Sequence, residues 1–407
     1  MVTLDKIARL AEESRFDSLG KAIYGGPKLN LAKVAALGDG TKHDVCASSA
    51  TPRVVEGLNR IGNAARSGIC HSFTHDGRCV SLFKTLFTNA CGHQCNYCSN
   101  ASSCGGKGKV LSYTPEELAK VTLQLYRGNY IEGLFLSSGI GRDEDILMEK
   151  MLESVRLLRH KYRFQGYVHL KILPGSQLEY IKQALELVDR VSINIETPTK
   201  LYMDEISPTK DYANDILLRQ RMIRDTAKKQ KLHAGQTTQF VVGAAGESDA
   251  EIFKRMLREY REMEMKRSYF SAFSAVPNTP FSKKDSQPLW REHRLYQMDW
   301  LHRVYEFKDS EMTLPFDEEG FLGNTDPKLA IAREYHDRPV DPNEAEYHEL
   351  LRVPGIGPKS AYRILLMRKQ EAIKKMDQLK KLGVVMKRAS PFLKLNGWYD
   401  STLDRWF

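Results

Sequence analysis

The chain has 407 residues, which is enough to bury a large core and to form two or more domains. Its seven cysteines, an odd number in a chain of this size, favour a reducing compartment over a disulfide framework. The sequence contains no apolar run long enough to cross a bilayer, and the stretch 3–19 has the pattern of an amphipathic helix and not of a signal peptide. We therefore expect a cytoplasmic protein with no membrane partner.

The net charge of +10 is concentrated near the C-terminal end of the sequence. Residues 350–407 contain 13 Lys and Arg against 4 Asp and Glu, which gives this stretch a net charge of +9. Such a concentration is the electrostatic footprint of a phosphate-binding surface. A solvated helical face is the simpler alternative.

Four regions are expected along the chain. Segment 1–75 has helical patches broken by Pro and Gly, and we expect it to pack on the domain that follows. Residues 76–280 alternate strand-like runs with amphipathic stretches, which is the pattern of βα units around a parallel sheet. Residues 281–343 are expected to form a connecting helical region, and residues 344–407 a separate all-α domain.

Hydrophobic periodicity divides the second region into individual elements. The expected strands lie at 80–87, 133–138, 166–172, 188–195, 236–242 and 268–274. The expected helices lie at 115–129, 144–162, 177–186, 211–230 and 248–265. The first of these helices has a well-marked start, because Thr114 can cap it, Pro115 suits its first position and Glu117 completes a capping box.

Three closely spaced cysteines, Cys91, Cys95 and Cys98, follow the first expected strand. An iron-sulfur cubane normally takes four Cys ligands, so a set of three leaves one iron open to a substrate. Their loop follows the carboxyl end of a strand, where the active sites of parallel β/α barrels lie. A zinc site completed by His93 or Cys104 is the alternative, since zinc accepts mixed Cys and His ligands.

The spacing of the three cysteines resembles that of the radical S-adenosylmethionine (SAM) enzymes. The resemblance implies a 4Fe-4S cluster whose open iron chelates SAM, and an electron from the cluster that cleaves SAM to a 5′-deoxyadenosyl radical. It also implies a six-stranded, partly open β/α barrel. Tyr97 stands where the family usually has an aromatic residue beside the adenine, although simple loop packing would also account for it. A low-potential donor such as flavodoxin or ferredoxin would supply the electron.

Polar residues at every second position mark two of the expected strands. Every second side chain of a strand points to the same face. Ser192, Asn194 and Glu196 therefore share one face, and so do His169 and Lys171. If these faces line the barrel, then Lys171, Asn194 and Glu196 are candidates to hold the ribose, the methionine carboxylate or the substrate. If the faces point outward, these are ordinary solvent-side residues.

The expected strand at 133–138 ends in Ser137-Ser138-Gly139. Many members of the radical SAM family have a Gly-Gly-Glu type segment here that binds the methionine amino group, so the resemblance makes Ser137, Ser138 and Gly139 candidate cofactor contacts. The acidic residue of the family is absent, and backbone carbonyls or hydroxyls would have to accept those hydrogen bonds. A Gly-Ser turn after a strand is also routine loop chemistry.

Four further cysteines lie outside the three-cysteine loop, at Cys46, Cys70, Cys79 and Cys104. An auxiliary cluster or metal site that also involved His71 could use some of them. Their wide and uneven spacing favours free buried cysteines instead.

The segment around Gly355-Ile356-Gly357 resembles a helix-hairpin-helix motif, whose Gly-Ile-Gly turn presents backbone N–H groups to DNA phosphates. Glycine permits the unusual backbone conformation and the close approach of a ligand, and Pro358 can start a helix whose N-terminus favours an anion. A degenerate second copy follows at 379–389, as expected if two hairpins pair. The candidate nucleic-acid contacts are Gly355, Ile356, Gly357, Lys359, Ser360, Arg363, Lys387 and Arg388. A helical hairpin used only for protein contacts is the alternative.

Further motifs make the chain similar to one group of radical SAM proteins, which carry a C-terminal helix-hairpin-helix and are associated with DNA modification or repair. These motifs lie at 44–46, 68–71, 76–79, 354–359 and 382–389. The group resemblance implies a uracil-DNA-glycosylase-like partner. The chain departs from the group at His93-Gln94, which replace a Tyr-Asp pair.

These patterns predict an enzyme that cleaves SAM and acts on nucleic acid, with duplex DNA favoured over RNA as the ligand. A radical enzyme that modifies RNA is the nearest alternative. Two further alternatives remain. One is a redox-sensing protein that binds nucleic acid without turnover, and the other is an enzyme that acts on a small molecule or peptide and uses its helical tail to bind a partner.

Overall fold

The computed structural model describes residues 31–39, 41, 69–73, 79–102, 110–141, 143–335 and 339–399. The chain divides into two compact units, one made of Met1–Glu247 with Lys254–Gln287 and the other of Ser248–Phe253 with Pro288–Phe407. Most of the expected N-terminal segment 1–75 lies outside the described residues, as do Cys46 and Cys104.

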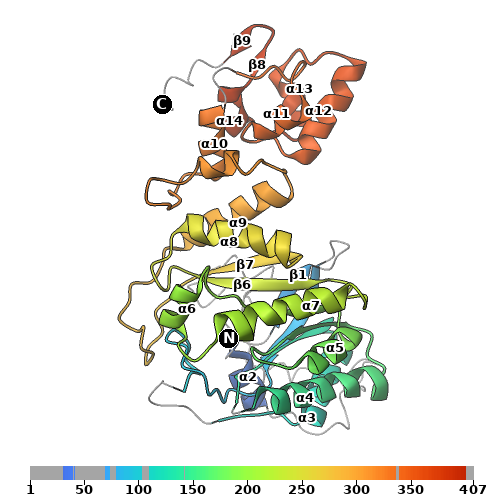
Figure 1. The fold of residues 1–407 in the computed structure, drawn as a ribbon. Helices are drawn as coiled ribbons and strands as arrows, with labels where there is room; N and C mark the ends of the chain where they lie inside the picture. The colour runs from blue at the N-terminus through green and yellow to red at the C-terminus, as the bar shows by residue number, and fades with distance from the viewer. Residues whose placement is uncertain are drawn as a thin grey trace, which may run out of the picture. The chain divides into compact units, whose positions relative to one another are not determined.

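A seven-stranded sheet forms the centre of the first unit, with its strands in chain order from β1 to β7 (Figure 1). The strands are β1 Ile69–Phe73, β2 Cys79–Leu86, β3 Gly133–Ser137, β4 Tyr167–Lys171, β5 Arg190–Ser192, β6 Gln236–Val242 and β7 Arg267–Ala272. Strands β2 to β7 pair in parallel, whereas β1 pairs antiparallel with β2. The six parallel strands confirm the expected partial β/α barrel, and β1 is an addition that the sequence did not predict.

Helices follow the parallel strands and pack against their neighbours along the chain (Figure 1). The helices of this unit, including those of π type, are α2 Leu31–Asp39, α3 Pro115–Arg127, α4 Glu144–Arg156, η2 Leu157–Lys161, α5 Leu178–Leu187, α6 Lys200–Ile206, η3 Tyr212–Leu218 and α7 Arg219–Ala227, and α8 Asp249–Glu262 runs through both units. The expected helix at 144–162 is thus α4 continued by a π-helical turn, and the one at 211–230 begins with a π-helical turn. Helix α6 was not expected.

The strands and the helices around them both supply the apolar core of this unit. Every residue of β3 and β6 is buried, as is typical of parallel strands that are covered on both faces. Strand β5 is shorter than the expected 188–195, because the chain leaves regular strand geometry after Ser192 and reaches a left-handed conformation at Glu196, with φ of 64°. This departure places the residues after β5 at the carboxyl edge of the sheet.

The second unit is mainly helical. Its helices are α9 Leu289–Arg303, η4 Glu311–Thr313, α10 Pro327–Tyr335, α11 Tyr347–Arg352, α12 Pro358–Gln370, α13 Met376–Lys381, α14 Met386–Ala389 and η5 Ser390–Phe392. A short hairpin of β8 Lys394–Leu395 and β9 Trp398–Tyr399 adds two strands that the sequence did not predict. None of the helices in the described part of the chain has the length and hydropathy of a membrane span.

The start of α3 has the capping box that the sequence predicts. The Thr114 side chain accepts a hydrogen bond from the Glu117 N–H at 3.2 Å, and the Glu117 carboxylate accepts one from the Thr114 N–H at 3.3 Å. We expect Thr114→Ala to lower the free energy of unfolding by about 1 kcal/mol, because the Glu117 N–H in the first turn loses the hydroxyl that accepts its hydrogen bond. Urea denaturation measures the change.

Thr199→Ala is the matched control, since Thr199 is the N-cap of α6 but its side chain makes no capping hydrogen bond. Equal losses of stability in the two variants would contradict the role of the Thr114 cap.

Candidate functional site

The three-cysteine loop lies at the carboxyl edge of the sheet, directly after β2. Its backbone is held on two sides, because the Gly92 N–H donates to the Ile140 carbonyl at 2.6 Å and the Asn96 N–H donates to the Ile206 carbonyl at 2.8 Å. The loop that follows β3 and the loop that follows α6 therefore fix the cysteines in place. Main-chain contacts of this kind define a geometry that does not depend on neighbouring side chains.

Side chains of the loop after α6 also form hydrogen bonds with the cysteine loop. The Ser207 hydroxyl lies 3.1 Å from the Cys95 sulfur, and the Thr209 hydroxyl accepts from the Gln94 N–H at 2.9 Å. The same Thr209 oxygen lies 3.1 Å from Nδ1 of His93. His93 is therefore engaged through this nitrogen, which leaves only its other ring nitrogen for the metal contact that the zinc alternative requires.

One cavity brings together all the site residues that the sequence predicts in the barrel. Its lining includes Cys91, Cys95, Tyr97, Cys98, Ser137, Ser138, Gly139, Lys171, Asn194 and Glu196. The polar faces of β4 and of the segment after β5 thus turn toward the cavity and not toward solvent. Beneath it, His169 is buried with its Nε2 atom 2.8 Å from the Ser192 hydroxyl and its ring stacked on Phe135.

Burial governs the protonation of the cysteines. It raises the pKa of the Cys95 thiol, and burial together with the neighbouring Cys95 raises the pKa of Cys98 to about 12. A thiolate and not a thiol is the ligand of a metal, so binding of iron would release protons from these groups.

Lys210 places a cation beside the three cysteines. Burial alone would lower the pKa of its ammonium group, but the charges of Cys95 and Glu196 outweigh burial and raise it. Its Nζ atom lies 3.5 Å from a carboxylate oxygen of Glu196, and both side chains are less than a tenth exposed. This buried ion pair provides one positive and one negative group on the wall of the cavity.

Glu196 has a strained backbone, because a left-handed φ of 64° is uncommon for a residue with a side chain. Its N–H donates to the Gln239 carbonyl at 2.9 Å, and its carbonyl accepts from the Val241 N–H at 2.8 Å. Its carboxylate also pairs with the Tyr97 hydroxyl, whose pKa is raised well above its usual value, first by burial and then by Glu196. The conformation thus aims the carboxylate at Tyr97 and Lys210.

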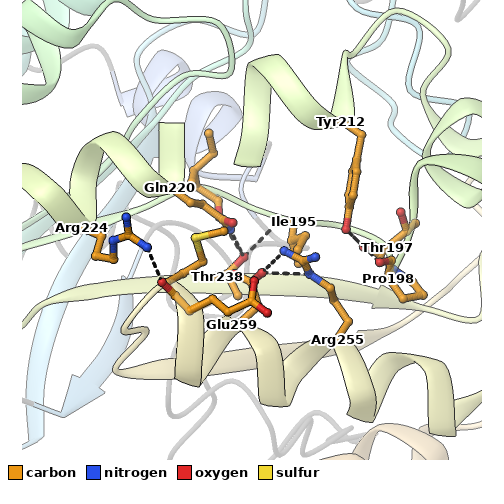
Figure 2. A network of polar contacts seen from close by, with 12 residues as sticks. Ile195, Thr197, Pro198, Tyr212, Gln220, Arg224, Thr238, Arg255 and Glu259 are labelled. Carbon is orange, nitrogen blue, oxygen red and sulfur yellow. Dashed lines mark hydrogen bonds and ion pairs between the residues drawn. The ribbon is translucent and has the colours of Figure 1, made fainter. Parts of the chain in front are cut away.

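A polar network supports the segment around Glu196 from below (Figure 2). The buried Thr238 hydroxyl accepts from the Ile195 N–H at 2.9 Å and donates to the Ile193 carbonyl at 2.9 Å. On the other side of Glu196, the Tyr212 hydroxyl lies 3.1 Å and 2.9 Å from the carbonyls of Thr197 and Pro198. The strained conformation is therefore held from both directions.

Figure 2 also shows the ion pair of Arg255 and Glu259 within α8, close to Thr238. The Arg255 Nε–H donates to the Glu259 carboxylate at 2.9 Å, and Gln220 reaches the Thr238 hydroxyl at 3.5 Å. Burial raises the pKa of Glu259 to about 7, against the opposing effect of Arg255. The network thus couples α7 and α8 to the strand that supports Glu196.

The segment after β3 offers a polar atom to the cavity. Among the described residues, the buried Ser138 hydroxyl has no hydrogen-bond partner. Gly139 is required by close packing, since a Cβ atom there would lie 2.5 Å from the Ala90 carbonyl oxygen in the cysteine loop. Ser138 is thus available to a ligand, whereas Gly139 has a structural reason to be glycine.

The other two cysteines that the structure describes, Cys70 and Cys79, are not part of this cavity's lining. Cys70 is buried in β1 and packs with Val80, Leu82 and Phe135, and Cys79 is exposed at the start of β2. Among the residues that the structure describes, no three His, Cys, Asp or Glu side chains surround the position of a single ion. The described residues therefore contain no preformed site of this kind for an auxiliary metal.

Lys210, Ser207 and Thr209 are residues that sequence reasoning missed. They stand in the run Ser207-Pro208-Thr209-Lys210, which follows the unexpected helix α6 and reads as an ordinary turn. The only available signal was a lysine next to a Ser-Pro turn, and this is too common to indicate a site. Their role depends on a loop that lies more than 100 residues from the cysteines in sequence.

The side chains that line the cavity fit the cofactors that three cysteines in a β/α barrel imply. Three sulfurs line one cavity, as three irons of a cubane require. The unpartnered Ser138 hydroxyl and the charges of Lys210 and Glu196 can meet the polar groups of an amino-acid ligand such as the methionine part of SAM. The Tyr97 ring provides a flat surface on the same cavity wall.

The predicted helix-hairpin-helix forms a second candidate site, within the second unit. Gly355 has φ of 87°, and a Cβ atom there would lie 2.5 Å from the Val385 carbonyl oxygen. The Val385 N–H in turn donates to the Gly355 carbonyl at 2.9 Å. The first glycine turn is thus in direct contact with the second turn, at Gly383, whose φ is 92°.

The basic residues around the two turns point to solvent. The exposed ones are Lys359, Arg363, Lys387 and Arg388. Ile356 and Ser360 are buried, so these two contribute through packing and their backbone. Arg388 also forms an ion pair with Asp326 at 2.8 Å. Four cations therefore surround a pair of glycine turns.

A parallel β/α sheet with three cysteines at its carboxyl edge defines an iron-sulfur class of barrel protein. Residues 85–258 match the family model of the radical SAM superfamily, and residues 336–388 match that of the helix-hairpin-helix motif. The chain therefore contains a radical SAM domain and a C-terminal helix-hairpin-helix motif, and the radical SAM domain implies a 4Fe-4S cluster and SAM as cofactors.

Solved structures with a similar fold include methylornithine synthase (PylB), at 12% identity and a TM-score of 0.42, with 52% of this chain and 60% of that chain covered. HydG, a maturase of the [FeFe]-hydrogenase, matches at 12% identity and a TM-score of 0.41, with 67% and 54% covered. The methyltransferase TsrM from Kitasatospora setae matches at 9% identity and a TM-score of 0.38, with 59% and 47% covered. The chain thus spans about 60% of the first of these proteins and about half of the other two. A search of curated proteins found no match.

We expect Cys95→Ala to lose nearly all bound iron after anaerobic reconstitution, because two cysteines cannot hold a cubane that needs three. Iron and sulfide counting and the visible absorbance of the protein measure this loss. Cys79→Ala is the control, since Cys79 is exposed at the start of β2 and should leave the iron content unchanged. Stoichiometric zinc in the wild-type protein, or full iron in Cys95→Ala, would contradict the assignment.

We expect Thr238→Val to lower the free energy of unfolding by about 1 to 2 kcal/mol, because the Ile195 N–H and the Ile193 carbonyl both lose their partner. Thr237→Val is a closely matched control. The neighbouring Thr237 is equally buried, but among the described residues its hydroxyl has no hydrogen-bond partner, so its loss should be neutral or stabilising. Denaturant unfolding of both variants tests the difference, and indistinguishable stabilities would argue against the support of Glu196 by Thr238.

Proposed function

We propose that this radical SAM enzyme acts on nucleic acid, with duplex DNA as the favoured substrate, and that it modifies or repairs it. The observation that carries the proposal is the pair of glycine turns in the second unit, which are joined by the Val385 to Gly355 hydrogen bond and surrounded by exposed cations. Backbone N–H groups at such turns and at helix starts bind phosphate groups well.

The charge of the chain supports the same role. Residues 350–407 hold nearly all of the net positive charge, and they include both turns. Helix α12 begins at Pro358 with no side-chain cap at Gly357, so its first N–H groups are left for an outside acceptor.

The barrel holds the chemistry in this proposal. When bound, the reduced cluster supplies the electron that cleaves SAM to a 5′-deoxyadenosyl radical. The three cysteines would hold the cluster, Lys210 and Glu196 would hold the charged groups of SAM, and the Tyr97 ring would contact the adenine. Ser137, Ser138, Gly139, Lys171 and Asn194 would complete this cofactor site.

The substrate must reach a cavity at the ends of strands. A base or sugar stacked inside a duplex cannot do so, and we therefore infer that the enzyme acts on an extruded nucleotide, a damaged site or a strand end. A low-potential protein such as flavodoxin or ferredoxin would deliver the electron. A cytoplasmic location and a uracil-DNA-glycosylase-like partner belong to the same proposal.

Assays of 5′-deoxyadenosine formation by the anaerobically reduced enzyme distinguish the competing functions. We expect duplex DNA to stimulate its formation, in a comparison with single strands, structured RNA and no polymer. Stimulation by RNA alone would favour an RNA-modifying enzyme. A complete lack of 5′-deoxyadenosine with every polymer, despite a full cluster and DNA binding, would favour a redox sensor.

We expect the binding of duplex DNA to weaken steeply with salt, with a slope of about −3.6 in log affinity against log salt if about 4 phosphates are contacted. The double variant Lys359→Ala/Arg363→Ala should reduce this slope by about 1.8, because two cations are removed. Fluorescence anisotropy at several salt concentrations measures both slopes.

Lys374→Ala is the matched control, because Lys374 is exposed in the same unit but lies outside both turns and pairs with Glu371. A flat salt dependence in the wild-type protein, or an unchanged slope in the double variant, would remove the phosphate-binding role from the first turn.

A further inference from the structure

A buried lysine lies directly against the first glycine turn. Lys328 belongs to α10 and is only 7% exposed. Its Nζ atom donates to the carbonyl of Ile356, the central residue of the turn, at 2.5 Å. The same ammonium group lies 4.6 Å from the centre of the Tyr305 ring. The Ile356 carbonyl is thus held by a lysine side chain, whereas the neighbouring Gly355 carbonyl accepts from the Val385 N–H.

The direction of this contact determines where the turn offers its donors. In a trans peptide unit the C=O and N–H groups point in opposite directions. Because the Ile356 carbonyl points toward Lys328, the Gly357 N–H of the same peptide unit points away from it. In the described part of the chain this N–H makes no backbone hydrogen bond, and no side chain caps the start of α12.

Burial of a lysine at this position has a cost as well as the gain of its hydrogen bond to the Ile356 carbonyl. A buried ammonium group loses its hydration, and an apolar side chain of similar size would cover the Tyr305 ring without that loss. The carboxylate of Asp326, which favours the charged form of Lys328, also pairs with Arg388 at 2.8 Å. Lys328 therefore shares this counter-ion, and it lies behind a turn that carries the exposed Lys359 and Arg363 nearby.

We propose that Lys328 is a positioning residue for phosphate binding: it holds the Ile356 carbonyl, so that the Gly357 N–H faces outward, and adds a positive charge behind the turn. This inference rests on the proposed nucleic-acid role of the turn. It concerns a residue outside the helix-hairpin-helix turns themselves, and it predicts that the phosphate site is sensitive to a group that no ligand touches.

The charge of Lys328 makes the proposal testable through pH. Burial and the neighbouring Arg388 lower the pKa of Lys328 to about 7, while Asp326 acts in the opposite direction. Tyr305, the other titratable group against it, has a raised pKa and stays neutral near pH 7. A bound phosphate favours the charged lysine, so binding takes up a proton above pH 7, and affinity should fall as pH rises from about 7 to 9, by at most about tenfold per pH unit.

The experiment uses the full-length protein and a fluorescein-labelled DNA duplex, with anisotropy titrations between pH 6 and pH 9. We expect Lys328→Met, which keeps the length of the side chain, to bind about tenfold more weakly at pH 6 and to lose the decline above pH 7. Lys328→Arg should retain most of the affinity, and its decline above pH 7 should also vanish, because arginine stays charged. Lys374→Met is the control for the removal of one exposed lysine, and thermal unfolding confirms that each variant is folded.

A merely structural role for Lys328 would change the unfolding temperature of Lys328→Met but not the pH profile of binding. The inference is overturned if the wild-type protein binds DNA equally well at pH 7 and pH 9, a result that needs no folded variant. It is also overturned if folded Lys328→Met binds with the wild-type affinity and pH profile. If the wild-type protein shows no salt-dependent binding at all, the proposed nucleic-acid role fails instead.

Discussion

The parallel direction of six neighbouring strands is the constraint on which the rest of the first unit depends. Strands that run in one direction bring the loops at their carboxyl ends to the same edge of the sheet. The cysteine loop, the Ser137–Gly139 segment and the chain after β5 meet there around one cavity. The cysteine loop is held by main-chain hydrogen bonds from Gly92 and Asn96, so its shape is set by its backbone and not by its thiols.

Buried charge is the second feature that organises this site. Lys210 and Glu196 form an ion pair that is almost inaccessible to solvent, and burial of such a pair is weak as a source of stability. The backbone strain at Glu196 has the same implication, because it persists only where surrounding contacts enforce it. Here Thr238 and Tyr212 supply those contacts. The buried ion pair and the strained backbone both cost free energy of folding. A charged ligand such as SAM explains why both are present at this site.

Close backbone packing organises the candidate site of the second unit. Glycine at position 355 allows two turns to approach until their backbones are hydrogen-bonded, which leaves no room for a side chain between them. The same close packing buries Ile356 and directs its carbonyl to Lys328. Donor groups and exposed cations then remain on the outer side of the turns. The cofactor site and the proposed phosphate-binding turns can thus be tested by separate mutations.

The sequence by itself determined the alternation of strands and helices, the capping box at Thr114, the three-cysteine spacing and the glycine turn at 355–357. Each of these depends on residues that are close together in the chain, so that periodicity, propensity or spacing reveals them. The tertiary structure alone decided which polar residues share the cavity, that Glu196 is left-handed, and that Lys210 and Lys328 lie beside groups far away in sequence. No local pattern marks such a lysine, because its role is created by the distant segment that the fold brings against it.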